Sequence, residues 1–142
     1  MPTTARKTRW YSTGGPWGTG LLLLGVATTL QGVAYTFGNP AELSPALQWA
    51  GLGVPIRALG LMWLTAGAYS IFRALTPPQR HTDVIPVVTV ICLWSIIYLL
   101  HWVYSGVFLA DWTREWTAGL AWGSLGALIV SWSRCVNPPT GR

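Results

Sequence analysis

Long apolar stretches separated by short polar connections fill most of this chain. Each stretch is about 20 residues long, the length at which an apolar helix crosses the hydrocarbon core of a bilayer. No stretch alternates polar and apolar residues as a membrane strand would. The pattern therefore predicts an all-α integral membrane four-helix bundle that forms a single domain over residues 1–142. We expect its spans at about residues 17–37, 55–75, 84–108 and 113–133.

Three of the four stretches carry a small residue, mostly glycine, at every seventh position. A seven-residue repeat keeps one face of a helix turned toward a partner, and small residues on that face let two backbones approach closely in lipid. We therefore expect these faces to mediate helix packing. The residues are Gly18, Gly25 and Gly32, then Gly53, Gly60, Gly67 and Ala74, and finally Gly119, Gly126 and Ser133, with Gly123 as a further packing position.

The third stretch has a bulky stripe instead of a small one. Its side chains, spaced alternately by four and three residues, are Trp94, Tyr98, His101, Ser105 and Phe108. A bulky stripe and a small-residue groove are complementary in shape. We expect the third span to supply the ridges and the other three spans to supply the grooves.

Prolines and capping residues mark the predicted helix ends. Pro55 stands where a proline in the first turn costs no hydrogen bond. Thr82 and Asp83 are expected to cap the third span, and Asp111 or Thr113 the fourth, because their side-chain oxygens accept hydrogen bonds from first-turn amides.

The connections predict how the spans are joined. The longest one, residues 38–54, contains Ser44–Pro45, which is typical of a helix start, so residues 46–50 are expected to form a small helix in the membrane interface. The connection between the third and fourth spans is only a few residues long. Those two helices should therefore be antiparallel neighbours.

Composition supports lipid as the solvent, and charge predicts the orientation. Only 9% of the residues are charged, against about 25% in soluble domains. With the N-terminus in the cytoplasm, seven basic residues lie inside and two outside, which satisfies the positive-inside rule for cytoplasmic N- and C-termini. The inside residues are Arg6, Lys7, Arg9, Arg73, Arg80, Arg134 and Arg142, and the outside ones are Arg57 and Arg114.

A cleaved signal peptide is the alternative reading of the first stretch. Its front is basic, but its apolar part is long, contains Gln31 and is not followed by a clear small-x-small cleavage site. A membrane span is the interpretation we adopt.

Few polar residues lie within the predicted spans. Three of them, Gln31, Arg57 and His101, fall in the outer half of the predicted bilayer. There they could form one intramembrane polar cluster together with Asp111 or Glu115. The functional interpretation is an ion or proton site or a gate. The structural interpretation is interhelical hydrogen bonding, with Arg57 reaching out to the interface.

The sequence lacks the residue patterns that several classes of function require. We expect no enzyme activity and no cofactor, because no nucleophile–base set, paired carboxylates or phosphate-binding glycine loop occurs. A metal site is not expected, since His81 and His101 fall on opposite sides of the membrane. Nucleic acid is not an expected partner, because the basic cluster near the N-terminus reads as a topology signal. Cys92 and Cys135 lie at different depths, which argues against a disulfide, and Cys92 is expected to pack as a small apolar residue.

The four spans, the small size and the composition, which has eight Arg and one Lys, resemble those of small membrane proteins in the lysis regions of actinobacterial phages, including holin-type proteins. The resemblance covers the whole chain but carries over no functional residue. It implies a protein of the bacterial cytoplasmic membrane that forms homo-oligomers and permeabilises the membrane.

Two other functions need the same bundle. One is a structural or accessory subunit that binds another membrane protein. The other is a small channel or transporter that uses Gln31, Arg57 and His101. A permanent aqueous pore within one chain is not expected, because the inner half of the bundle lacks a polar stripe.

Overall fold

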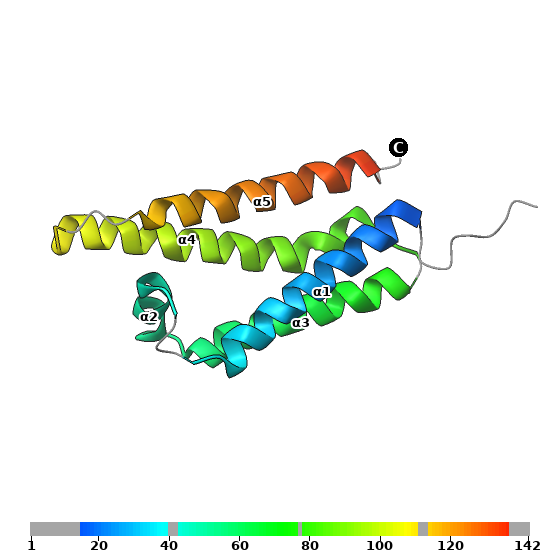
Figure 1. Ribbon diagram of the computed structural model, residues 1–142. Helices are drawn as coiled ribbons and strands as arrows, with labels where there is room; N and C mark the ends of the chain where they lie inside the picture. Colours follow the sequence, from blue (N-terminus) through cyan, green and yellow to red (C-terminus); the bar gives the residue numbers. More distant parts are fainter. Residues whose placement is uncertain (1–14, 40–42, 77, 111–113, 137–142) are drawn as a thin grey trace, which may run out of the picture.

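The computed structural model describes residues 15–39, 43–76, 78–110 and 114–136, and within these the regular structure is helical throughout (Figure 1). The four long helices begin and end within three residues of the predicted spans. The helices are α1 (Gly15–Phe37), α2 (Pro45–Gly51), α3 (Ile56–Leu75), the 3₁₀ helix η2 (His81–Val84), α4 (Ile85–Phe108) and α5 (Glu115–Val136). The small helix expected in the first connection is α2.

The long helices form two antiparallel pairs, α1 with α3 and α4 with α5 (Figure 1). Contacts between α3 and α4 join the pairs, and α2 lies beside α4. The start of α1 and the end of α5 lie at the same end of the molecule (Figure 1). The prediction that the third and fourth spans are antiparallel neighbours is confirmed.

Within the described residues, three helices are long and apolar enough to cross a membrane: residues 16–37, 56–75 and 81–108. The fourth long helix, α5, has 22 residues but is not one of these candidates. Glycine, serine and threonine lower the mean hydropathy of α5, and Glu115 and Arg134 lie near its two ends. Three of the four predicted spans therefore have the length and apolar composition of a membrane helix, and the fourth span, at α5, stays a prediction.

The glycine faces of α1 and α3 pack against each other. A Cβ atom added to Gly25 would lie 2.9 Å from the backbone nitrogen of Ile71, and one added to Gly32 would lie 2.6 Å from that of Leu64. Distances this short leave no room for a side chain. The expectation that both faces receive the bulky stripe of the third span is therefore wrong, because two small faces bring the backbones closer than a ridge and a groove do.

The small face of α5 packs on α4, but on Leu99, Ser95 and Ile91 rather than on the bulky stripe that was predicted to supply the ridges. A Cβ on Gly119 would lie 2.9 Å from Cγ of Leu99, and one on Gly123 would lie 3.1 Å from Oγ of Ser95. The Ser95 hydroxyl donates a hydrogen bond to the carbonyl oxygen of Gly119 at 2.7 Å. A Cβ atom on Gly126 would lie at an ordinary contact distance of 3.4 Å from Cγ2 of Ile91.

Two residues that were expected to pack between helices, Gly53 and Phe108, lie away from the helix contacts. A third expected packing residue, Gly18, is buried. Gly53 is exposed in the turn after α2, where the nearest atom to an added Cβ is the Ala50 oxygen at 3.8 Å, so it does not pack between helices. Phe108 is 73% exposed, so the bulky stripe of α4 ends at Ser105. Gly18 is buried near the start of α1.

An aromatic cluster in the middle of the bundle joins all four long helices. It consists of Tyr35 from α1, Trp63 from α3, Trp94 from α4 and Trp122 from α5. The ring of Trp63 meets those of Trp94 and Trp122 edge-on, with centroids 5.2 and 5.5 Å apart. The indole of Trp94 donates a hydrogen bond to the Tyr35 hydroxyl at 3.1 Å. Edge-to-face aromatic pairs of this kind add to the energy of close packing.

Candidate functional site

A buried polar cluster lies at the end of the bundle where α5 begins. The imidazole of His101 on α4 contacts the carboxylate of Glu115, the first residue of α5, through Nδ1 and Oε2. The other carboxylate oxygen accepts a hydrogen bond from the backbone N–H of Ala46 at 3.1 Å. Their side chains are only 9% and 12% exposed. Glu115 therefore connects three helices with one carboxylate.

Local structure explains why a carboxylate is stable there. First-turn amides of a helix have no partner within the helix, and the N-terminal end carries a partial positive charge. Glu115 lies at the start of its own helix and also meets the first turn of α2. Ser44, in the cap position of α2, makes no side-chain hydrogen bond to that helix. The carboxylate of Glu115 satisfies one of the amides that Ser44 leaves open.

Aromatic and hydroxyl groups of α2 and α4 enclose the cluster. The ring of Trp49 lies 5.8 Å from that of His101 and 5.7 Å from that of Tyr104. The hydroxyls of Ser44 and Tyr98 share a hydrogen bond of 2.9 Å. These contacts hold α2 against α4 and separate the imidazole from the surroundings of the helix bundle.

The expected cluster of Gln31, Arg57 and His101 does not assemble. Within the described residues, no hydrogen bond or ion pair joins any of the three to another. Arg57 is exposed in the first turn of α3 and lines a pocket with residues 35–38. Gln31 is half-buried on α1. Of the two acidic partners considered, Glu115 contacts His101, and Asp111 lies outside the described residues.

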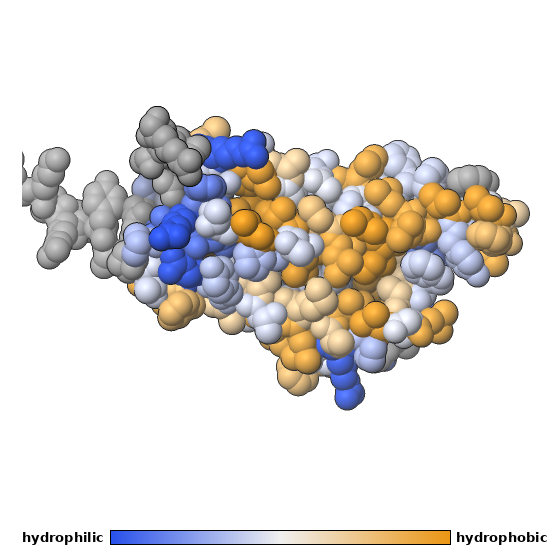
Figure 2. All heavy atoms as spheres, turned by 180° about the vertical axis from the view of Figure 1, so that it is seen from behind, coloured by the Kyte–Doolittle hydropathy of each residue, from blue (hydrophilic) through white to orange (hydrophobic). Residues whose placement is uncertain are grey.

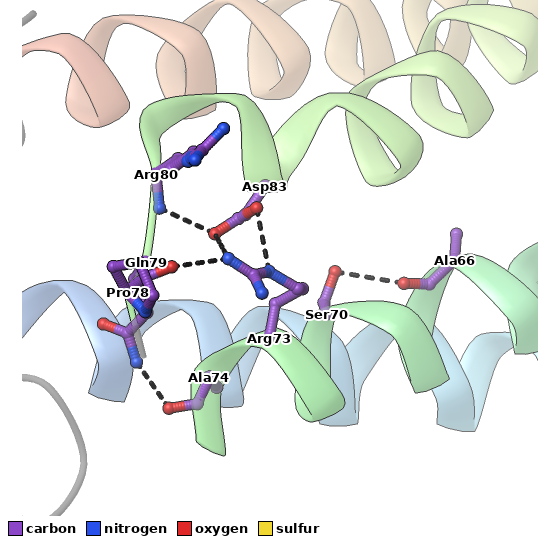
Figure 3. A network of polar contacts seen from close by, with 8 residues as sticks. All are labelled: Ala66, Ser70, Arg73, Ala74, Pro78, Gln79, Arg80 and Asp83. Carbon is purple, nitrogen blue, oxygen red and sulfur yellow. Dashed lines mark hydrogen bonds and ion pairs between the residues drawn. The ribbon is translucent and has the colours of Figure 1, made fainter. Parts of the chain in front are cut away.

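A second polar cluster closes the turn between α3 and α4 (Figure 3). The guanidinium of Arg73 donates to both oxygens of Asp83, through Nε at 3.0 Å and Nη2 at 3.3 Å, and Nη2 also donates to the Pro78 oxygen. The N–H of Arg80 donates to Asp83 at 2.7 Å. The Asp83 side chain is only 4% exposed. The cluster therefore fixes the angle at which α4 leaves α3.

The capping predictions for these helices need correction. Asp83 accepts its amide hydrogen bond from Arg80 and so caps η2, whereas α4 has Val84 in its cap position and no side-chain cap. Thr82 is exposed and makes no cap. The 3₁₀ turn shifts the start of α4 past both residues. Thr113, like Asp111, lies outside the described residues.

Both polar clusters consist of paired side chains. Each carboxylate is occupied by a basic partner and a backbone amide, and the aromatic cluster lies between the two ends. Among the described residues, no group of three metal-binding side chains occurs. Cys92 and Cys135 are free and exposed. Sγ of Cys92 lies 3.7 Å from a Cβ atom placed on Gly126, so Cys92 contacts α5 without being buried.

Sequence reasoning missed the Arg73–Asp83 pair and the attachment of Glu115 to α2. The first had a signal, since a basic residue in the last turn of one helix precedes an acidic residue just before the next helix. The second had none, because the position of a short connecting helix depends on tertiary contacts. No known protein family, curated protein or solved structure matches this chain.

Proposed function

We propose that this chain is a small four-span protein of the bacterial cytoplasmic membrane, with both termini in the cytoplasm, and that it serves as an accessory subunit. In this proposal it binds another membrane protein along the exposed face of α5. The observation that carries the proposal is the composition of that face.

Membrane insertion of the whole bundle has support from its surface. Large apolar side chains on the long helices are exposed, including Leu30 at 63%, Phe72 at 61% and Leu128 at 66%. Figure 2 shows a broad hydrophobic surface along the molecule, with most of the strongly hydrophilic residues at one end and one more projecting from the lower edge. That arrangement fits helices in hydrocarbon with basic residues at the cytoplasmic side. Because α5 packs along α4, it would cross the same membrane.

The exposed surface of α5 combines large apolar residues, among them Leu120, Leu125 and Leu128, with small ones. Apart from Leu128, one exposed stripe along this helix consists of small or weakly polar residues at helical spacing, namely Thr117, Ala121, Ser124, Ser131 and Cys135. Such residues are enriched where membrane helices contact each other. The glycine faces of α1 and α3 are already occupied within the chain. The α5 stripe is therefore the small-residue surface that remains available to a partner.

Photo-crosslinking in cells tests the proposal. A photoreactive amino acid at Ser124 should give a discrete protein adduct, whereas the same amino acid at Val26, an exposed residue of α1, should give lipid adducts only. Mass spectrometry of the Ser124 adduct identifies the partner. Identical lipid adducts at both positions would contradict an accessory role through α5.

A holin-type function is the second candidate, because the same stripe suits a second copy of the chain. In that case the Ser124 adduct would contain only this protein, and the protein in nanodiscs would form large assemblies. Inducible expression would also collapse the membrane potential and stop growth. Continued growth at full potential would argue for the accessory role. A transport function has less support, since Gln31, Arg57 and His101 are not joined.

A further inference from the structure

A groove runs between the first half of α4 and the last part of α5. Its cavity volume is about 600 Å³, within the range of small-molecule sites. Its walls are apolar and include Val88, Leu93, Ile96 and Val130. His81, Thr82 and Arg134 line the same groove near the end of the molecule where α4 begins. The groove therefore has an apolar body and a polar, basic mouth.

The length of the apolar part matches one leaflet of a bilayer. Its α4 residues extend from Ile85 to Ile96, which is about 16 Å at the helical rise of 1.5 Å per residue. The hydrocarbon core is about 30 Å thick, so each leaflet contributes roughly half of it. Cys92 lies in the middle of this wall and is exposed. An extended acyl chain would cover this apolar wall along its whole length.

The mouth carries positive charge that no described residue neutralises. Arg134 is exposed, and no described residue forms an ion pair with it. The nearby carboxylate, Asp83, is already held by Arg73. Figure 3 shows the guanidinium of Arg80 turned away from that pair. Basic pockets between membrane helices at the cytoplasmic side are typical sites for anionic lipid headgroups.

We propose that the groove between α4 and α5 binds one anionic phospholipid of the inner leaflet. The phosphate lies at Arg134, with Thr82 and His81 as hydrogen-bonding neighbours, and one acyl chain extends along Val88, Cys92 and Ile96. The site rests on the membrane placement proposed above, but it does not depend on the partner at α5.

Native mass spectrometry with defined lipids tests the site. The full chain is purified in detergent, delipidated, and mixed with phosphatidylglycerol or with phosphatidylcholine. We expect one phosphatidylglycerol to be retained, and Arg134→Gln to weaken its binding about tenfold, since a charge-assisted hydrogen bond to phosphate is lost. Cys92→Trp, which fills the groove, should abolish retention of this lipid.

Matched variants keep the result interpretable. Arg57→Gln removes an exposed arginine at the other end, and Leu30→Trp adds bulk on an exposed face of α1, so both should retain the lipid. Equal retention of the two lipids, unaffected by Arg134→Gln, would overturn the proposal. A protein dimer lost in Cys92→Trp would assign the groove to a second copy instead. A persistent Ser124 adduct in Arg134→Gln would show that the partner proposal stands separately.

Discussion

Gly25 and Gly67 face each other across the contact between α1 and α3. A Cβ atom on Gly25 would lie 3.0 Å from the Gly67 carbonyl oxygen, and one on Gly67 would lie 2.8 Å from the Gly25 oxygen. The Thr29 hydroxyl donates to the same Gly25 oxygen at 2.8 Å. Two backbones thus touch directly, and the pair sets the distance between the two helices.

Gly67→Ala should destabilise the bundle although alanine is the better helix former. The added methyl would meet the backbone nitrogen of Thr29 at 2.6 Å, and a backbone cannot rotate away as a side chain can. We expect a loss of about 1–3 kcal/mol in the free energy of unfolding, measured by denaturation in detergent. Gly53→Ala is the matched control, because its nearest atom is 3.8 Å away. Equal stability of the two variants would refute the close contact.

Glu115→Ala should release α2 from the bundle. The substitution leaves the amide of Ala46 and the imidazole of His101 without their shared acceptor. An unsatisfied buried polar group costs about 1–3 kcal/mol. The loss of local stability should be largest in α2, where the Ala46 amide loses its acceptor. We therefore expect faster hydrogen exchange at residues 46–50, measured by mass spectrometry, with little change in the middle of α4.

Glu115→Gln is the informative companion of that variant. Its amide oxygen still accepts one hydrogen bond, so exchange in α2 should lie between the rates of the wild type and of Glu115→Ala. If both variants leave α2 as protected as in the wild type, the carboxylate does not hold this helix.

The helices themselves follow from the sequence because their length and apolar composition decide them. Any apolar stretch of about 20 residues must satisfy its backbone within itself in lipid, so the ends of α1, α3 and α4 were predictable to within a few residues. The seven-residue spacing also indicates that the faces of Gly25 and Gly60 are buried. It does not say which surface buries them, since a small face fits a bulky stripe and another small face equally well.

For the polar clusters, the sequence indicated which residues were candidates but not which of them come into contact. Sequence placed His101 and Glu115 at a similar depth, and the short connection between α4 and α5 brings them together. Arg57 lies at that depth too, but it stands in the first turn of α3. The direction of its side chain depends on how α3 is rotated about its axis, and the apolar periodicity of the sequence does not determine that rotation near a helix end. The position of α2 depends on Glu115 and Tyr98, residues far away in sequence.

Trp94→Ala should be among the most destabilising substitutions in the chain. Trp94 is fully buried, and its ring touches those of Tyr35 and Trp63. Removing a buried tryptophan side chain costs about 3–5 kcal/mol through lost packing and the cavity left behind. Trp116→Ala is the control, since that residue is 42% exposed. Thermal unfolding in one detergent compares the two, and similar midpoints would contradict a central role for the aromatic cluster.

The Arg73–Asp83 pair should show energetic coupling rather than two independent effects. Asp83→Asn alone leaves the guanidinium without its counter-charge, and Arg73→Gln alone leaves a carboxylate that is 4% exposed. Removing one partner of a buried pair is costly, whereas removing both is often nearly neutral. We expect the double variant to be more stable than the sum of the single losses predicts, so that the double-mutant cycle gives a favourable coupling energy. Arg80→Gln keeps the backbone N–H that bonds to Asp83, so it should leave stability within about 0.5 kcal/mol of the wild type. Additive losses in the double-mutant cycle would mean that the turn between α3 and α4 is held by its backbone contacts alone.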